Sequence, residues 1–245
     1  MAEGWLIVWV LAVIFIATLI RSAFGFGEAL VAVPLLALLI PVEVAAPLAV
    51  LVSITVAVVI VLEDWHKVHF SSAWRLVLST LFGIPLGLLL LTRVPGPAVK
   101  TVLAVVIIVF SAYCLARRMP LELHDDRLAW LFGFTAGVLG GAYGMNGPPL
   151  VIYGSLRRWS AEHFRATLQG YFLPASVVGM VGYWYAGLWV SPVTRYYLLS
   201  LPVVAASIVL GRMVNRRLAG RSFTRYVHIA LILIGATLLV QSVVL

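Results

Sequence analysis

The stretch RSAFGFGEALVAVP, residues 21–34, decides the fold, because glycines and a carboxylate interrupt an otherwise apolar sequence there. Apolar segments at about 5–20 and 29–40 flank the interruption. Backbone that leaves a helix inside a membrane must be buried in protein or face water, because lipid offers its N–H and C=O groups no partner. Gly25, Gly27 and Glu28 are therefore expected to mark a functional site.

The same pattern returns in the second half of the chain as GAYGMNGPPLVIYG, residues 141–154. In this alignment Gly144 falls opposite Gly25, and Asn146 falls opposite Gly27. Glycines also allow close helix packing in membranes, and for one break that alternative is equally good. Two breaks in register favour a binding site near the middle of the membrane, as in transporters built from two related halves.

The composition is that of an integral membrane protein. Hydrophobic residues make up 63% of the 245 residues and charged residues 11%, against about half and about a quarter in soluble domains. The net charge of +8 comes from basic residues between apolar runs, where they orient a protein in the bilayer, so we expect a lipid partner and no nucleic acid. The single cysteine, Cys114, and scattered histidines predict neither a metal site nor a cofactor. The N-terminus lacks a basic region before its apolar run and is expected to be retained.

Ten apolar segments divide into two sets of five, at about 5–20, 29–40, 44–62, 71–91 and 99–116, and at about 128–140, 149–156, 166–186, 196–211 and 226–244. A crossing takes about 20 residues, so the second segment of each set is expected to end partway across. The prediction is an all-α integral membrane protein of two repeats, residues 1–118 and 128–245, joined by a linker at 119–127. The first pair of segments in each repeat is expected to be broken or re-entrant.

The basic residues predict that the second repeat is inverted. An odd number of segments turns the second copy over, and a cytoplasmic linker at 119–127 then assigns every loop to one side. Thirteen basic residues fall inside and three outside (Arg93, Lys100 and Arg195), with Arg75 within a segment start. The inner residues are Arg21, Lys67, Arg117, Arg118, Arg127, Arg157, Arg158, Arg165, Arg212, Arg216, Arg217, Arg221 and Arg225. This bias places both termini outside.

The chemistry of the two breaks points to a small anion. A helix that starts behind each break offers free N–H groups and the positive end of its dipole. The residues expected to bind are Gly25, Gly27, Glu28, Gly144, Asn146, Gly147 and Gln169. Arg165 is expected as a peripheral or gating contact; for it and for Arg21, the sequence leaves open whether the guanidinium reaches the site or extends to the interface.

Glu28 has two interpretations. An ionisable residue near mid-membrane is costly and by default functional, which makes Glu28 a candidate proton carrier beside an anion site. Alternatively, its carboxylate caps a helix start. Pro85 and Pro202 occupy equivalent positions in the repeats and are expected to kink helices.

No catalytic fingerprint argues for an enzyme, although a membrane enzyme acting on lipid and a passive anion channel remain as rivals. The segments FGFGEALVAVPLLALLIP, AAPLAVLVS, LFGIPLGLLLL and GAYGMNGPPLVIYG together resemble the TauE/SafE family of sulfite exporter-like transporters. The chain departs from the family's GxGGG form at Glu28 and Asn146. The resemblance implies a secondary transporter that moves sulfite or an organosulfonate outward across the bacterial inner membrane. The exact substrate, direction, coupling ion and any homo-oligomer stay open.

Overall fold

The computed structural model describes residues 2–64, 70–116, 123, 126–159, 161–217, 229 and 231–240. The described part is all α-helical, as predicted. The first half forms α1 (Ala2–Phe24), α2 (Glu28–Ala37), α3 (Val42–Asp64), α4 (Phe70–Arg93) and α5 (Gly96–Ala116). The second forms α6 (Ala129–Tyr143), α7 (Gly147–Leu156), α8 (Ala161–Tyr185), α9 (Ser191–Arg217) and an unlabelled helix, Leu231–Val240.

Five of the described helices are long and apolar enough to cross a membrane. They are Gly4–Ala23, Val42–Leu62, Trp74–Arg93, Gly96–Ala116 and Ser191–Met213. Large apolar side chains remain exposed along them, for example Phe82 at 68% and Val109 at 62%. Such surfaces suit a lipid solvent, and the protein is therefore a multi-pass membrane protein.

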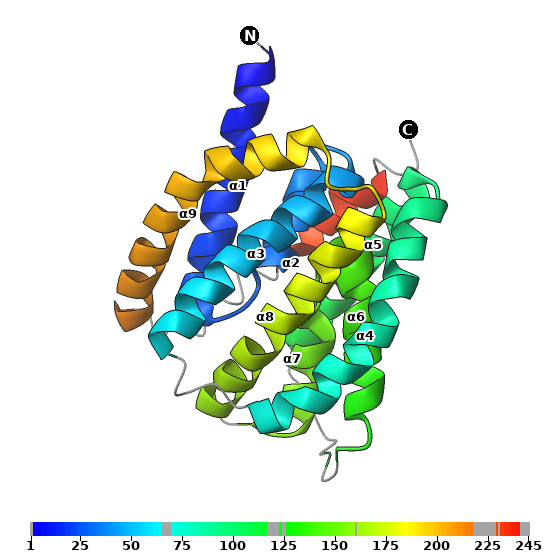
Figure 1. Cartoon of the computed structure of the whole chain (residues 1–245), viewed down its shortest axis with the longest axis vertical. Coiled ribbons are helices and arrows are strands. Elements are labelled where there is room, and N and C mark those ends of the chain that lie inside the picture. The colour runs from blue at the N-terminus through cyan, green and yellow to red at the C-terminus, as the bar shows by residue number, and fades with distance from the viewer. Residues whose placement is uncertain are drawn as a thin grey trace.

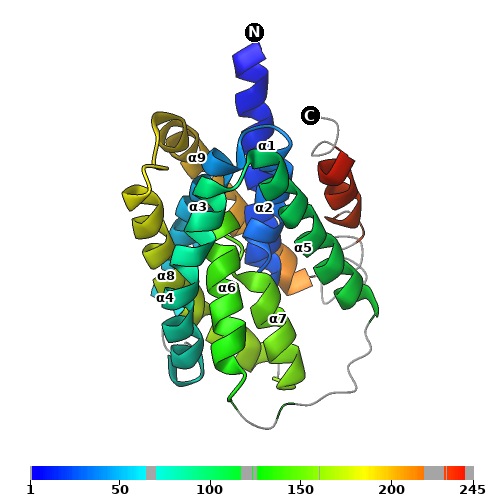
Figure 2. The same cartoon turned by 90° about the vertical axis from the view of Figure 1, so that its right-hand side faces the viewer.

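The helix breaks fall where the sequence predicts them, between α1 and α2 and between α6 and α7. Both helices that follow a break, α2 and α7, have 10 residues. Ten residues of helix rise about 15 Å, roughly half the hydrocarbon thickness. Figure 2 shows α2 above α7, so that the two short helices together occupy the depth of the molecule.

The helices that precede the two breaks, α1 and α6, run in opposite directions. In Figures 1 and 2, α1 descends from the N-terminus at the top, whereas α6 ascends from the turn before it at the bottom. The most extensive packing crosses between the halves, because α4 lies along α6 and α9 lies along α1. In each case the fourth helix of one half covers the first helix of the other.

The contact between α4 and α6 depends on glycines. A Cβ on Gly137 would lie 2.4 Å from the carbonyl oxygen of Thr80, and one on Gly87 would lie 2.1 Å from that of Val138. Backbone atoms cannot rotate away as a side chain can, so these glycines set the distance between the two helices. Pro85 lies inside α4 and its predicted counterpart Pro202 lies inside α9.

Some predictions lie outside the described residues. They concern most of the linker 119–127, the basic residues Lys67, Arg117, Arg118, Arg221 and Arg225, and the side chains of Arg165 and Gln169.

Candidate functional site

The two helix breaks meet at one cavity. A cavity of about 30 Å³ is lined by Gly27 and Glu28 from the first break and by Gly144, Asn146 and Gly147 from the second. These are five of the residues that the sequence predicts to bind. Gly25 belongs to the first break but not to the lining. Residues 119 positions apart in the alignment therefore come together in space.

Three of the predicted glycines at the breaks hold backbone that other residues adopt only with strain. Gly25 has φ of 83°, Gly27 has φ of 96°, and Gly144 has φ of 65°. Gly147 differs, because it is the first residue of α7 and its φ is not positive. The sequence predicts that Gly147, like Gly144, adopts backbone angles closed to other residues, and for Gly147 that prediction is wrong. A Cβ at Gly147 would meet nothing within 4 Å, so a methyl group there would occupy open space at the cavity wall.

The two helix starts are unequal as anion sites. Val31 donates to the carbonyl oxygen of Gly27 at 3.1 Å, which closes the first turn of α2 and leaves the N–H groups of residues 28–30 without helical partners. In α7, residues 148–149 are prolines and have no N–H group, so Gly147 has the only backbone donor among the first three residues of that helix. The start of α2 is therefore the stronger electrophilic end of the cavity.

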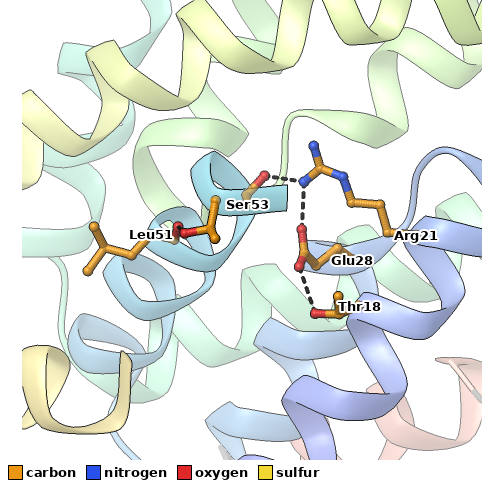
Figure 3. Close-up of polar contacts among 6 residues, drawn as sticks. Thr18, Arg21, Glu28, Leu51 and Ser53 are labelled. Carbon is orange, nitrogen blue, oxygen red and sulfur yellow. Dashed lines mark hydrogen bonds and ion pairs between the residues drawn. The ribbon is translucent and has the colours of Figure 1, made fainter. Parts of the chain in front are cut away.

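Arg21 is the charged residue that the structure adds to the site. It lies near the end of α1, it is 2% exposed, and it lines the cavity. Its Nη1 donates to Glu28 Oε2 at 2.5 Å and to Ser53 Oγ at 2.5 Å (Figure 3). Thr18 Oγ1 donates to the other carboxylate oxygen of Glu28 at 3.0 Å. This network joins α1, α2 and α3 around one buried ion pair.

The rest of the Arg21 guanidinium has no hydrogen-bond partner in the described structure. The atoms concerned are Nε and Nη2, and both are buried. These two nitrogens share one edge of the planar group and donate in parallel, the geometry that binds two oxygens of one oxyanion. The guanidinium carbon lies over the face of the Phe172 ring, 5.3 Å from the ring centroid. Arg21 thus presents an unused bidentate edge beside a cavity.

The structure resolves the ambiguity over Arg21 and corrects its place among the inner basic residues. A side chain that is 3% exposed and paired with Glu28 is not an interfacial arginine. Without Arg21, twelve basic residues are still assigned to the inner side and three to the outer side, so the positive-inside bias remains. The sequence contains evidence for this pairing, because Arg21 and Glu28 are opposite charges seven positions apart in an apolar region, one on each side of the break. An unpaired charge there would be costly, so the two are each other's natural partner.

Glu28 does not act as a helix cap in the described structure. Its hydrogen bonds go to Thr18 and Arg21 instead of to the backbone at the start of α2. The carboxylate neutralises the guanidinium, and the helix start keeps its free donors for another group. The site as a whole therefore carries no net charge from this pair, and its electrophilic character comes from the unused Arg21 edge and the helix N-termini.

Asn146 is held by a buried chain of hydroxyl groups. Its Nδ2 lies 3.5 Å from Tyr171 Oη, which lies 2.6 Å from Thr80 Oγ1. Thr80 in turn donates to the carbonyl oxygen of Gly133 at 2.8 Å. Because a carbonyl only accepts, the chain runs from the amide through Tyr171 and Thr80 to α6. Ser176 of α8 also lines the cavity and, like Ser53, is a hydroxyl that sequence reasoning leaves out of the site.

No group of three His, Cys, Asp or Glu side chains that could hold a metal ion gathers within the described residues.

Comparison with known proteins gives one result. A family model described as sulfite exporter TauE/SafE matches residues 10–238 of the chain, which includes both breaks and every residue of the cavity. No match was found among curated proteins or among solved structures.

Proposed function

Because the chain belongs to the TauE/SafE sulfite exporter family of membrane transporters, we propose that it exports a small sulfur-containing anion, sulfite or an organosulfonate, across the bacterial inner membrane. The observation that carries this proposal is the buried, unused Nε and Nη2 edge of Arg21 at the cavity. Sulfite and sulfonate groups each offer several oxygens on one sulfur atom, which suits a bidentate edge. The free N–H groups of residues 28–30 supply further donors.

The size of the cavity supports transport by alternating access. A volume of about 30 Å³ holds little more than a water molecule, so the walls must move for an anion with several oxygens to enter. We propose that the two halves are inverted repeats that rock about the site, with Pro85 and Pro202 as flexible points in α4 and α9. The opposite directions of α1 and α6, and the reciprocal packing of α4 on α6 and α9 on α1, support this proposal.

The predicted topology has a direct test. The charge bias assigns both termini to the outer side and the linker between α5 and α6 to the cytoplasm. A fluorescent protein that folds only in the cytoplasm is expected to stay dark when fused after Leu245 and to fluoresce when inserted into the linker. A bright C-terminal fusion at normal expression would refute the outward termini, and fluorescence from both the C-terminal and the linker fusion would refute the inversion.

Glu28 is proposed to couple transport to protons. An anion that binds the Arg21 guanidinium would compete with the Glu28 carboxylate for it. Protonation of the displaced carboxylate would then avoid leaving a buried charge without a partner. Glu28→Gln is therefore expected to transport with its pH dependence lost. The measurement is the initial rate of substrate efflux at several external pH values, with a trapped pH dye. Normal transport with unchanged pH dependence would remove Glu28 from the coupling mechanism.

The substrate is tested by efflux from proteoliposomes loaded in turn with sulfite, sulfoacetate, taurine, sulfate and a carboxylate. One sulfur anion is expected to leave faster than from protein-free liposomes. If none does, although the protein is monodisperse and helical, the proposed substrate is wrong. A passive channel is the second candidate, and an imposed proton gradient separates the two, because only a coupled transporter builds a substrate gradient uphill.

A further inference from the structure

A second charged cluster lies at the far end of α7. Asp126, in the turn before α6, accepts from Arg75 Nη1 at 3.0 Å and forms an ion pair with Arg157, whose Nη2 lies 3.1 Å from Asp126 Oδ1. Tyr153 Oη also donates to the Asp126 carboxylate, at 3.0 Å. Arg157 makes a further bond from Nη1 to the carbonyl oxygen of Leu123 at 2.9 Å. We call Arg75, Asp126, Tyr153 and Arg157 the inner latch.

The inner latch ties together three elements that the site depends on. Arg75 lies in the first turns of α4, Tyr153 in the last turn of α7, and Arg157 directly after α7. The backbone carbonyl of Asp126 accepts from Ala129 at 3.0 Å and so begins α6. One carboxylate therefore fastens the end of α7 to the starts of α4 and α6, whereas the helix start at Gly147 lies at the other end of α7.

The opposite face of the molecule is built differently. The other short helix, α2, ends beside an open pocket of about 390 Å³, lined by residues 37–43 together with Gly96, Pro97 and Lys100. Within the described residues no ion pair fastens that end of α2. Glu43 and Lys100 both line the pocket, but they do not form an ion pair with each other. One short helix is thus fastened by charges at its surface end, and the other is not.

We infer that the inner latch is a gate that holds α7 closed over the cytoplasmic side of the site and must separate each time the site opens inward. The inference rests on the proposed function for the assignment of the inner face.

Three features suit the latch to reversible separation. Asp126 is 45% exposed and Arg75 is 40% exposed, so water can solvate both charges when they part. A single carboxylate serves two cations, so one movement of the turn releases both. The latch contacts α7 away from the cavity, so it leaves the anion donors intact.

The test measures how fast a cysteine at the cavity reacts from each side of the membrane. Val151 lines the cavity from α7, and Val151→Cys in a Cys114→Ser background provides one thiol. Asp126→Asn keeps the size of the side chain and removes the charge. With a membrane-impermeant maleimide, Asp126→Asn is expected to raise the labelling rate in inside-out vesicles by roughly fivefold or more, and to leave or lower the rate in right-side-out vesicles. Arg75→Gln, which removes one of the two ion pairs, is expected to give a smaller rise on the same side.

Glu43→Gln is the matched control, because it removes one carboxylate from the opposite face and is expected to leave inner labelling unchanged. The inference is overturned if Asp126→Asn and Arg75→Gln label like the parent protein from the inner side, or if labelling rises equally from both sides. Labelling needs no substrate. If labelling rises on one side only and the protein moves no sulfur anion, the latch is supported and the proposed substrate is wrong. If the protein exports sulfite and labelling does not rise on one side, the proposed substrate is supported and the latch is wrong.

Discussion

Arg21→Lys is expected to lower the efficiency of anion transport by about 100-fold or more. Lysine keeps a positive charge for Glu28, so the buried carboxylate still has a partner, but the bidentate edge formed by Nε and Nη2 is lost. Two charge-assisted hydrogen bonds are worth about 1.5–3 kcal/mol each, and each 1.4 kcal/mol is about tenfold. The measurement is the initial rate of efflux over a range of substrate concentrations, where the loss should appear chiefly as a raised KM.

Arg93→Lys is the matched control for this variant. Arg93 ends α4 in an exposed position, so the same chemical change is expected to leave transport unaltered. Lysine is preferred to alanine at position 21, because removal of one partner of a buried ion pair costs about 3–5 kcal/mol and would confuse loss of binding with loss of fold. Transport by Arg21→Lys with an unchanged KM would show that the Arg21 edge does not hold the substrate.

Gly137→Ala is expected to destabilise the protein by about 3 kcal/mol, or to lower its melting temperature by roughly 6–12 °C. The new methyl group would lie 2.4 Å from the carbonyl oxygen of Thr80, which belongs to the backbone of α4 and cannot turn aside. The two helices must then move apart along their whole contact. The measurement is thermal unfolding of the purified protein in detergent, followed by circular dichroism.

Gly179→Ala provides the comparison. Gly179 is also a glycine within a helix, α8, but a Cβ added there meets nothing within 4 Å. Both substitutions gain the same helix propensity, of about 1 kcal/mol, so the difference between them isolates the effect of the α4–α6 contact. Equal melting temperatures for the two variants would mean that α4 and α6 do not approach as closely as described.

The helices and breaks could be predicted because they follow from local constraints. Apolar length predicts a membrane helix, and GFG and GMN interrupt helices whatever surrounds them. The starts of α2 and α7 were predicted within a residue or two for this reason. The pairing of two breaks at one cavity was also predictable, since the repeated pattern indicates equivalent places in two halves.

Tertiary contacts account for what the sequence did not predict. Arg21 resembles an interfacial arginine in a linear reading, because its position at the end of an apolar run is typical of the membrane surface. Only the fold shows that the chain turns at Gly25–Gly27 and brings Glu28 back beside it. The contacts of Asp126 were hidden in the same way, because its partners are far from it in sequence: Arg75 lies in α4 and Arg157 directly after α7.

Binding of sulfite to the purified protein, measured by isothermal titration calorimetry beside Arg21→Lys, tests the proposed site most directly. We expect one saturable site per chain in the wild-type protein, and binding weakened by about 100-fold in the variant while its helix content is unchanged. Equal affinity in the two proteins, or no binding by a folded wild-type chain to any sulfur anion, would contradict the assignment of the two helix breaks and Arg21 as the anion site.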